Sequence, residues 1–396
     1  MIIAALTPLH TNAVNTKSRT GCPKGGTPVK ITISQEALTN ILSTVAKAVS
    51  TKNTIPVLSG VYLSAQSNAL TLRATDMELA IESSIPCNVI AEGEIVLPAR
   101  YLTDLVRRIP FGDIELTADL RNFTATLRWG KSQYVIHGFS AEQFPSVPDT
   151  EGASAFTASQ VLLKDLLRQT TFAAGHDESK PWLTGVLFKL RENRLNGTAT
   201  DGVRIAYAET DAENPAGHSF SVIIPSRSLN ELGRLLSGEA ADTARIAVTA
   251  NQIFFDLGKV RVISRLLEGQ YPDVMRLVPQ NYPTEITLNR SEFLEAIERA
   301  ALIAKDGAVK IGLGDGRVTI TSNTPEVGQV YEEVPSGALL GDPLDIGFNS
   351  KFLIDYLKVL EEAEFKFQCS GSRNPARLHP ASNTHFIYVV LPLITY

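Results

Sequence analysis

The segment "LNGTATDGVRIAYAE" (residues 195–209) contains the local pattern on which the fold prediction rests. Apolar residues alternate with polar ones on both sides of a Thr-Asp-Gly corner, which predicts two strands joined by a tight turn. Related segments occur at 70–82 ("LTLRATDMELAIE") and 318–333 ("VTITSNTPEVGQVYEE"). The neighbours of the corner Asp or Asn differ among the three copies, so no base, nucleophile or metal ligand accompanies it. This favours a turn-forming role for Asp201 over a catalytic one.

Two kinds of helix recur along with this corner. One follows an expected polar N-cap, at Ser34, Ser159 and Asn289. The other follows a strand that ends in Pro or Asn and carries apolar residues at helical spacing; its copies are "VLPARYLTDLVRRI" (96–109), "IIPSRSLNELGRLL" (223–236) and "GFNSKFLIDYLKVL" (347–360). The second kind and the corners both repeat every 122–127 residues or so, which is the length of one domain. The pattern predicts an α+β protein of three repeated domains, each with two helices and a largely antiparallel sheet.

Domain boundaries are expected at two Pro-rich segments, "FPSVPDTEGAS" and "YPDVMRLVPQNYP". The predicted domains are residues 29–150, 151–279 and 280–396. Residues 1–28 show no apolar periodicity and are predicted to form a flexible extension.

Composition excludes several classes of protein. The three cysteines are scattered, so neither a disulfide framework nor a zinc site is expected. No apolar run is long enough to span a membrane and no signal peptide is present, which predicts a cytoplasmic protein. No metal or cofactor site is predicted: "HDESK" (176–180) is expected to be an exposed loop, and "GLGDGR" (312–317) joins two strands rather than opening a helix.

Basic residues recur in the second helix of each copy although the net charge is −5. They are spaced seven apart, close to two helical turns, so each pair lies on one helical face; the pairs are Arg100 and Arg107, Arg227 and Arg234, and Lys351 and Lys358. A single helix of this kind is an ordinary solvated face, but three copies make a DNA-facing role equally well supported. Such rows would follow a phosphate backbone without reading bases.

With these features the chain resembles the bacterial DNA polymerase III β subunit, the sliding clamp family. The resemblance rests on nine segments in family order over residues 29–396, among them "NTIPVLSGVYL", "FSAEQFPSVPD", "ATDGVRIA", "LLEGQYPDV" and the ending "YVVLPL". It implies three domains of one topology per subunit and two subunits closed head to tail into a ring around duplex DNA. It also implies a non-catalytic processivity factor that binds itself, the polymerase, the clamp loader and other clamp-motif proteins. The weighed rivals are a cytosolic enzyme with an active site between domains and an extracellular β-rich binding module, for which a signal peptide would be expected.

The resemblance also implies three sets of site residues. A peptide-binding pocket would be formed by Leu183, Thr200, Gly202, Val203, Arg204, Ile205, Pro272, Arg276, Leu277, Phe352, Val389, Leu391, Pro392 and Leu393. Lys52 would join the six basic helix residues in facing DNA. Phe123, Leu302 and Ile303 would lie at the dimer interface. The ending Ile394-Thr395-Tyr396 and the poorly matching segment "CSGSRNPARLHP" depart from the family pattern, which predicts an altered peptide preference.

Overall fold

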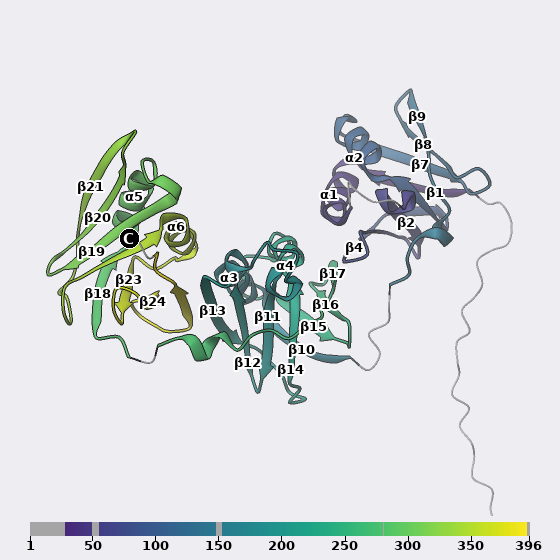
Figure 1. Ribbon diagram of the computed structural model, residues 1–396. Helices are drawn as coiled ribbons and strands as arrows, with labels where there is room; N and C mark the ends of the chain where they lie inside the picture. The colour runs from purple at the N-terminus through teal and green to yellow at the C-terminus, as the bar shows by residue number, and fades with distance from the viewer. Residues whose placement is uncertain (1–27, 50–54, 148–152, 280, 394–396) are drawn as a thin grey trace, which may run out of the picture.

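The computed structural model describes residues 28–49, 55–147, 153–279 and 281–393. Apart from Pro28, the expected N-terminal extension lies outside these residues, as does Lys52. The described chain forms three units side by side in an arc, and the helices of each unit lie toward its concave side (Figure 1). The predicted α+β class is confirmed, with two α-helices in each unit. Within the described residues, no helix is both long and apolar enough to cross a membrane.

All three units repeat one order of elements, in which strand, helix and three strands occur twice. The first unit contains β1 (Val29–Ser34), α1 (Gln35–Val45), β2 (Gly60–Gln66), β3 (Ala69–Thr75), β4 (Leu79–Pro86), β5 (Asn88–Ala91), β6 (Gly93–Pro98), α2 (Ala99–Arg108), β7 (Asp113–Asp119), β8 (Thr124–Trp129) and β9 (Ser132–His137). The second contains β10 (Ser154–Ser159), α3 (Gln160–Thr170), β11 (Gly185–Arg191), β12 (Arg194–Thr200), β13 (Arg204–Asp211), β14 (Phe220–Pro225), α4 (Ser226–Gly233), β15 (Thr243–Val248), β16 (Gln252–Asp256) and β17 (Val260–Arg265). The third contains β18 (Thr284–Asn289), α5 (Arg290–Ala301), β19 (Ala308–Gly314), β20 (Arg317–Thr324), β21 (Gly328–Pro335), β22 (Leu344–Asn349), α6 (Ser350–Val359), β23 (Glu364–Cys369), β24 (Ala376–Pro380) and β25 (Phe386–Val390). Only β5 has no counterpart in the other two described units.

Two of the four sheets run across the boundaries between units. One eight-stranded sheet has the order β10-β15-β16-β17-β4-β3-β2-β6, so β17 of the second unit pairs with β4 of the first. The other has the order β14-β11-β12-β13-β25-β24-β23-β18, in which β13 pairs with β25 of the third unit. Backbone hydrogen bonds therefore join neighbouring units, and this makes the arc a continuous structure rather than three domains on flexible linkers.

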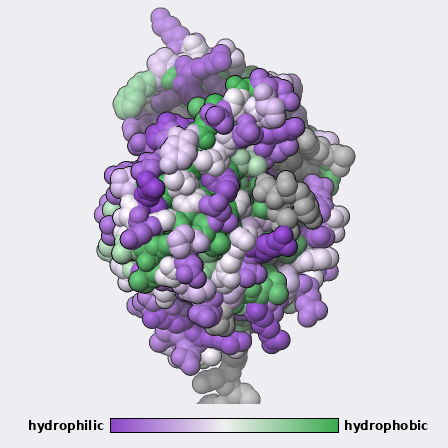
Figure 2. Space-filling view, turned by 60° about the vertical axis from the view of Figure 1, so that its left-hand side comes forward, coloured by the Kyte–Doolittle hydropathy of each residue, from purple (hydrophilic) through white to green (hydrophobic). Residues whose placement is uncertain are grey.

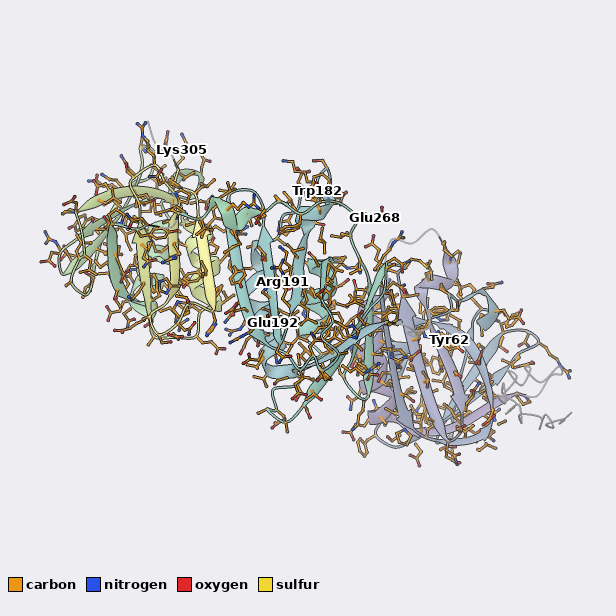
Figure 3. All side chains as sticks on the ribbon, turned by 90° about the horizontal axis from the view of Figure 1, so that it is seen from below. Tyr62, Trp182, Arg191, Glu192, Glu268 and Lys305 are labelled. Atoms are coloured by element: carbon orange, nitrogen blue, oxygen red, sulfur yellow. The ribbon has the colours of Figure 1, made fainter. Side chains whose placement is uncertain are left out.

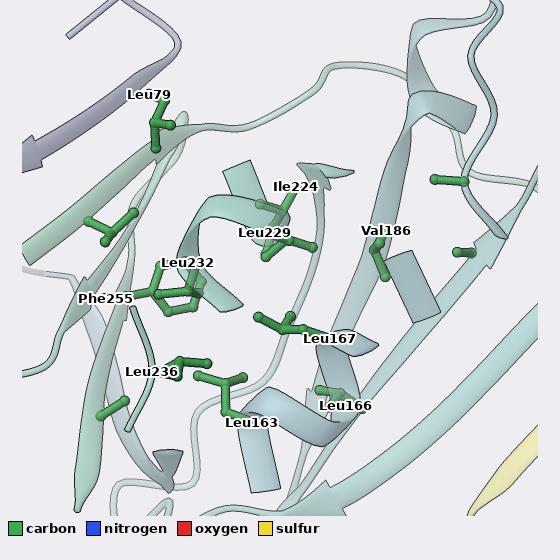
Figure 4. Packing of buried hydrophobic residues seen from close by; sticks show 14 of the residues in the cluster. Leu79, Leu163, Leu166, Leu167, Val186, Ile224, Leu229, Leu232, Leu236 and Phe255 are labelled. Carbon is green, nitrogen blue, oxygen red and sulfur yellow. The ribbon is translucent and has the colours of Figure 1, made fainter. Parts of the chain in front are cut away.

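The apolar stripes predicted for the helices form the core. In the second unit, leucines of α3 and α4 pack between the two sheets, where Leu163, Leu167, Leu229 and Leu232 meet Phe255 (Figure 4). Helices of this kind bury a single face, because each lies on a sheet and exposes its other side to solvent. The buried cluster continues into the neighbouring units along the shared sheets.

The expected helix caps are confirmed at two of three positions. The Ser34 hydroxyl accepts a hydrogen bond from the Ala37 N–H, and the Asn289 side chain accepts one from the Glu292 N–H. Ser159 occupies the N-cap position of α3, but its hydroxyl accepts no N–H group of the helix. The Gln160 N–H donates to the carbonyl of Asp242, as the first N–H groups of α1 and α5 donate to the carbonyls of Gly112 and Ala363. A backbone carbonyl thus binds the first N–H group of all three helices, and the side-chain caps of α1 and α5 are additional to it.

Candidate interfaces for a peptide, DNA and a second subunit

The corner at Asp201 is a turn, as the sequence predicts. The Asp201 carboxylate accepts the N–H groups of Val203 (2.9 Å) and Arg204 (3.0 Å). The Thr200 hydroxyl accepts the N–H of Gly202 and donates to the carbonyl of Arg204. Gly202 has φ +94°, a left-handed conformation that glycine adopts without steric cost.

Asp201 also binds the Arg204 side chain, which holds the second and third units together. The Arg204 guanidinium, 6% exposed, contacts the carboxylates of Asp201 (2.9 Å) and Asp355 (2.7 Å) and the carbonyl of Phe172 (2.9 Å). It also lies 4.6 Å from the centre of the Phe352 ring, a cation–π distance. Burial by itself would lower the pKa of Arg204, but Tyr388, Asp355 and Asp201 raise it. Arg204 is therefore a buried cation between two units, and three of its N–H groups are already bound within the chain.

The strands at this boundary bring most of the predicted pocket residues together. β13 and β25 place Ile205 opposite Val389, and the Leu391 N–H donates to the Val203 carbonyl (3.0 Å). The predicted residues comprise exposed Gly202, Val203, Pro272, Arg276, Leu277 and Leu391, half-buried Leu183, Ile205, Phe352, Pro392 and Leu393, and buried Thr200, Arg204 and Val389. The three exposed aliphatic side chains are Val203 (41%), Leu277 (70%) and Leu391 (42%).

The segment that follows β17 carries the remaining pocket residues past the same corner. Burial raises the pKa of the Tyr271 hydroxyl, and the nearby Asp201 carboxylate raises it further. A Cβ atom built on Gly269 would lie 3.1 Å from the Trp182 ring, so this segment packs on the short helix η5 (Pro181–Thr184). Trp182 and Glu268 accordingly project from the same edge of the middle unit (Figure 3). Tyr271, which lies near Asp201, is followed in the chain by Pro272 and then by the short helix η6 (Val274–Leu277).

The predicted DNA-facing residues in the described part of the chain are all on α2, α4 and α6 or at their ends. Their side chains are not equivalent, because three form ion pairs: Arg227 with Asp76 of the first unit (2.6 Å), Arg234 with Glu231 (2.5 Å) and Lys358 with Glu298 (2.8 Å). The other three have exposed side chains and no ion pair with any described residue; they are Arg100, Arg107 and Lys351.

The two ends of the arc carry uncovered sheet edges. β9 is the edge of the five-stranded sheet in the first unit, and β21 is the edge of the four-stranded sheet in the third. Their exposed side chains include Tyr134 (53%) and Val135 (54%) on β9 and Tyr331 (65%) on β21. Figure 2 looks toward the end formed by the third unit, where apolar patches lie among polar residues.

The three predicted interface residues lie beside these edges. The carbonyl of Phe123, in the turn between β7 and β8, accepts the N–H of Gly138 just after β9 (2.7 Å). Leu302 is 83% exposed at the end of α5. The carbonyl of the next residue, Ile303, accepts a hydrogen bond from Thr324, which pairs with the first residue of β21.

Sequence reasoning missed the contacts that join the units. Arg204 was assigned to the pocket, but its partners Phe172 and Asp355 were not identified. The residues are 32 and 151 positions from Arg204, and no local pattern connects them. The interdomain ion pair between Asp76 and Arg227 was missed for the same reason. In each case the sequence shows only a charged residue at or beside a corner. Its role in joining two units can be recognised only when the fold brings its partner against it.

The described residues contain no group of three or more His, Cys, Asp or Glu side chains arranged to hold a metal ion. "HDESK" begins in a loop before η5, and Asp177 and Glu178 are exposed. "GLGDGR" forms the hairpin between β19 and β20, as expected, with Gly314 opposite Arg317.

Comparison with known proteins identifies the family that the sequence resembles in each of the three units. Family models of the DNA polymerase III beta subunit match in order: the N-terminal domain at residues 29–148, the central domain at 157–273 and the C-terminal domain at 275–394. The beta sliding clamp of Bacillus subtilis (strain 168) is 34% identical over 380 residues, covering 93% of this chain and 100% of the relative. That of Staphylococcus aureus (strain Mu50) is 34% identical over 379 residues, with the same coverage.

Solved structures show the same fold. The DNA polymerase sliding clamp from Bacillus subtilis has a TM-score of 0.90 at 34% identity, covering 93% of this chain and all of the other. The DNA polymerase III subunit beta from Pseudomonas aeruginosa, bound to griselimycin, has a TM-score of 0.87 at 31% identity, covering 94% and 100%. Since the matches span all three units in order, this chain belongs to the bacterial DNA polymerase III beta-subunit family, the beta sliding clamps.

Proposed function

We propose that two copies of this sliding clamp close head to tail into a ring around duplex DNA and tether the replicative polymerase to it. The supporting observation is the pair of uncovered edges, β9 at one end of the arc and β21 at the other. An exposed edge strand with apolar side chains is a template for pairing with another chain. Because the two edges differ, pairing them is a heterologous contact, and it forms a closed ring when the curvature of the arc closes after two copies.

The charges beside the two edges are complementary. Lys131 adjoins β9 and Glu326 adjoins β21, whereas Glu333 on β21 is already paired with Arg317 (3.5 Å). Pairing β9 with β21 would place opposite charges close together and would bury Leu302. Pairing either edge with its own copy would instead bring like charges together, and this disfavours the wrong partner.

Duplex DNA would be held inside the ring by the helices. The six α-helices of the described chain lie toward the concave side of the arc, so two copies would line the hole with twelve. Arg100, Arg107 and Lys351 have free charges there, while the other three cations share theirs with carboxylates. A few unpaired cations on helices contact phosphates at any sequence and permit sliding.

Partner proteins would bind at the boundary between the second and third units. The exposed side chains of Val203, Leu277 and Leu391 offer an apolar surface, and Arg276 stands beside it with its side chain 85% exposed. A short segment with Gln and Leu or Phe side chains suits this chemistry, since aliphatic anchors carry most peptide affinity. We place the polymerase, the clamp loader and other replication and repair proteins here, in the cytoplasm.

We also propose the domain limits predicted from the sequence, which are residues 29–150, 151–279 and 280–396.

The ring is tested with a nicked circular plasmid and its linearised form. The purified protein is loaded on each by a clamp loader, and retention is measured by gel filtration. We expect retention on the circle and loss after linearisation, because a ring slides off free ends. Equal retention on both forms would contradict encirclement, and a single-chain mass in light scattering would contradict the dimer. Leu302→Asp, which puts a charge into the proposed interface, should abolish retention while leaving the monomer folded. Val327, in the turn between β20 and β21, is 68% exposed against 83% for Leu302; Val327→Asp should also weaken retention where the interface extends to this turn.

A further inference from the structure

A second pocket lies at the boundary between the first and second units. Its volume is about 220 Å³, and it is lined by the corner after β3, the segment after Phe144 and strands β16 and β17. Its apolar wall includes Leu79 and Ile263, which are almost fully buried, together with Pro145 and Val147. Drug-sized ligands occupy pockets of roughly 300–1,000 Å³, so this one suits one or two side chains of a peptide.

The hydrogen bonds of this boundary repeat those of the proposed peptide site. Thr75 and Asp76 make the same four hydrogen bonds as Thr200 and Asp201. In both corners the Thr hydroxyl accepts the N–H of the residue two positions later and donates to the carbonyl of the residue four positions later. The Asp carboxylate accepts the N–H groups of the residues two and three positions after the Asp. The N–H of Arg265 donates to the Glu78 carbonyl (2.8 Å), as that of Leu391 does to Val203.

This register gives a residue-by-residue correspondence between the two sites. Arg265 stands where Leu391 does and Ile263 where Val389 does, since β17 pairs with β4 as β25 pairs with β13. Met77 corresponds to Gly202. The second pocket therefore keeps the backbone frame but replaces an exposed leucine with an arginine.

Two features of the lining point to a ligand. Met77 is 55% exposed and has φ +79°, a conformation that is costly for any residue with a Cβ and that tends to persist at binding sites. Arg265 is exposed and forms no ion pair with any described residue. Arg73, the other cation, is already bound to Glu82 and lies over the Tyr62 ring. An apolar floor with one free guanidinium at its rim suits an aliphatic or aromatic side chain next to a carboxylate.

We propose that this pocket is a second peptide site, which binds a short partner segment whose apolar side chain enters between Leu79, Ile263 and Met77 and whose carboxylate pairs with Arg265. The site differs from the proposed pocket at the second boundary in its demand for a carboxylate. Each subunit thus presents two peptide sites of related frame and different selectivity, so that two partners can be held on one subunit. Glu78, also among the lining residues, repels a carboxylate, so the preference for one rests on Arg265.

The three methionines of the chain allow the two sites to be observed separately. Met77 lines the second pocket. Met275 lies in η6 (Val274–Leu277), in the segment that contributes to the proposed peptide pocket at the boundary between the second and third units. Met1 is outside the described residues. The protein is labelled with ¹³C-methyl methionine and titrated with acetyl-Gly-Leu-Phe bearing a free terminal carboxylate, and separately with the same peptide amidated. We expect a saturable shift of the Met77 methyl signal and at least fivefold weaker binding of the amide.

Variants separate direct binding from indirect effects. Arg265→Gln should weaken the response of Met77 at least fivefold, whereas Arg261→Gln, on the same strand but outside the lining, should not. Deletion of residues 391–396 should leave the Met77 response intact even where it abolishes that of Met275. The proposal is overturned if the peptide does not shift Met77 at millimolar concentration, if Arg265→Gln and Arg261→Gln behave alike, or if the deletion removes the Met77 response. Failure of the Met275 response alone would instead count against the proposed pocket at the second boundary.

Discussion

Leu277→Ala tests the proposed peptide pocket with little effect on the fold. The side chain is 70% exposed in the free chain, so a bound peptide has most of it left to cover. Full burial of a leucine side chain is worth about 1.5–3 kcal/mol, and the exposed share corresponds to about 1–2 kcal/mol. This predicts peptide binding weakened about 5- to 30-fold. The free energy of unfolding should change by less than about 0.5 kcal/mol, as is usual for an exposed position.

The assay is calorimetry with a short Gln- and Leu/Phe-bearing peptide, and the matched control is Leu340→Ala. Leu340 has a similar exposure (60%) and lies in the third unit, outside the proposed pocket. The control should bind the peptide like the parent. Parental affinity in Leu277→Ala would refute the assignment of this residue, and equal losses in both variants would show that the effect comes from surface hydrophobicity rather than from a pocket.

Three further predictions concern the domain boundary, pH and DNA. Asp355→Asn should lower the free energy of unfolding, measured by urea unfolding, by about 1.5 kcal/mol. This is the low end for a hydrogen bond to a charged group, because Asp355 is partly exposed. An unchanged urea midpoint would show that the contact with Arg204 is dispensable. The hydrogen-bonded Arg299 guanidinium holds the pKa of the Glu332 carboxyl below its ordinary value of 4.5. The ion pair therefore contributes its full stabilisation of β21 above pH 4.5, and this contribution is lost as the pH falls through the lowered pKa. Thermal unfolding from neutral pH downward should therefore show a smaller acid loss in Glu332→Gln, and identical pH profiles would contradict this. Arg107→Glu should reduce the salt dependence of DNA binding by about one unit of slope, and Arg234→Glu by less, because Arg234 shares its charge with a carboxylate; equal effects would argue against this ranking.

Much of the molecule follows from local sequence patterns. The three corners and the two kinds of helix give the repeat, the α+β class and the number of units, because turn chemistry and helical periodicity act over a few residues. The role of Asp201 in its turn is of the same kind, since both N–H groups that it binds lie within three residues. Side-chain caps do not follow from residue type alone, since Ser159 occupies the N-cap position of α3 without the side-chain hydrogen bond that Ser34 makes at α1.

Only the tertiary structure decided how the units join and which charges are free. The partners of Arg204 come from two other elements, one of them 151 residues away, and the pairings of β4 with β17 and β13 with β25 have no signal in either strand alone. Sequence spacing placed six basic residues on helical faces, but it could not show that Asp76 neutralises Arg227 from another unit. The physical reason is that periodicity reports which face a residue occupies, whereas net charge and pocket shape depend on what the fold brings against that face.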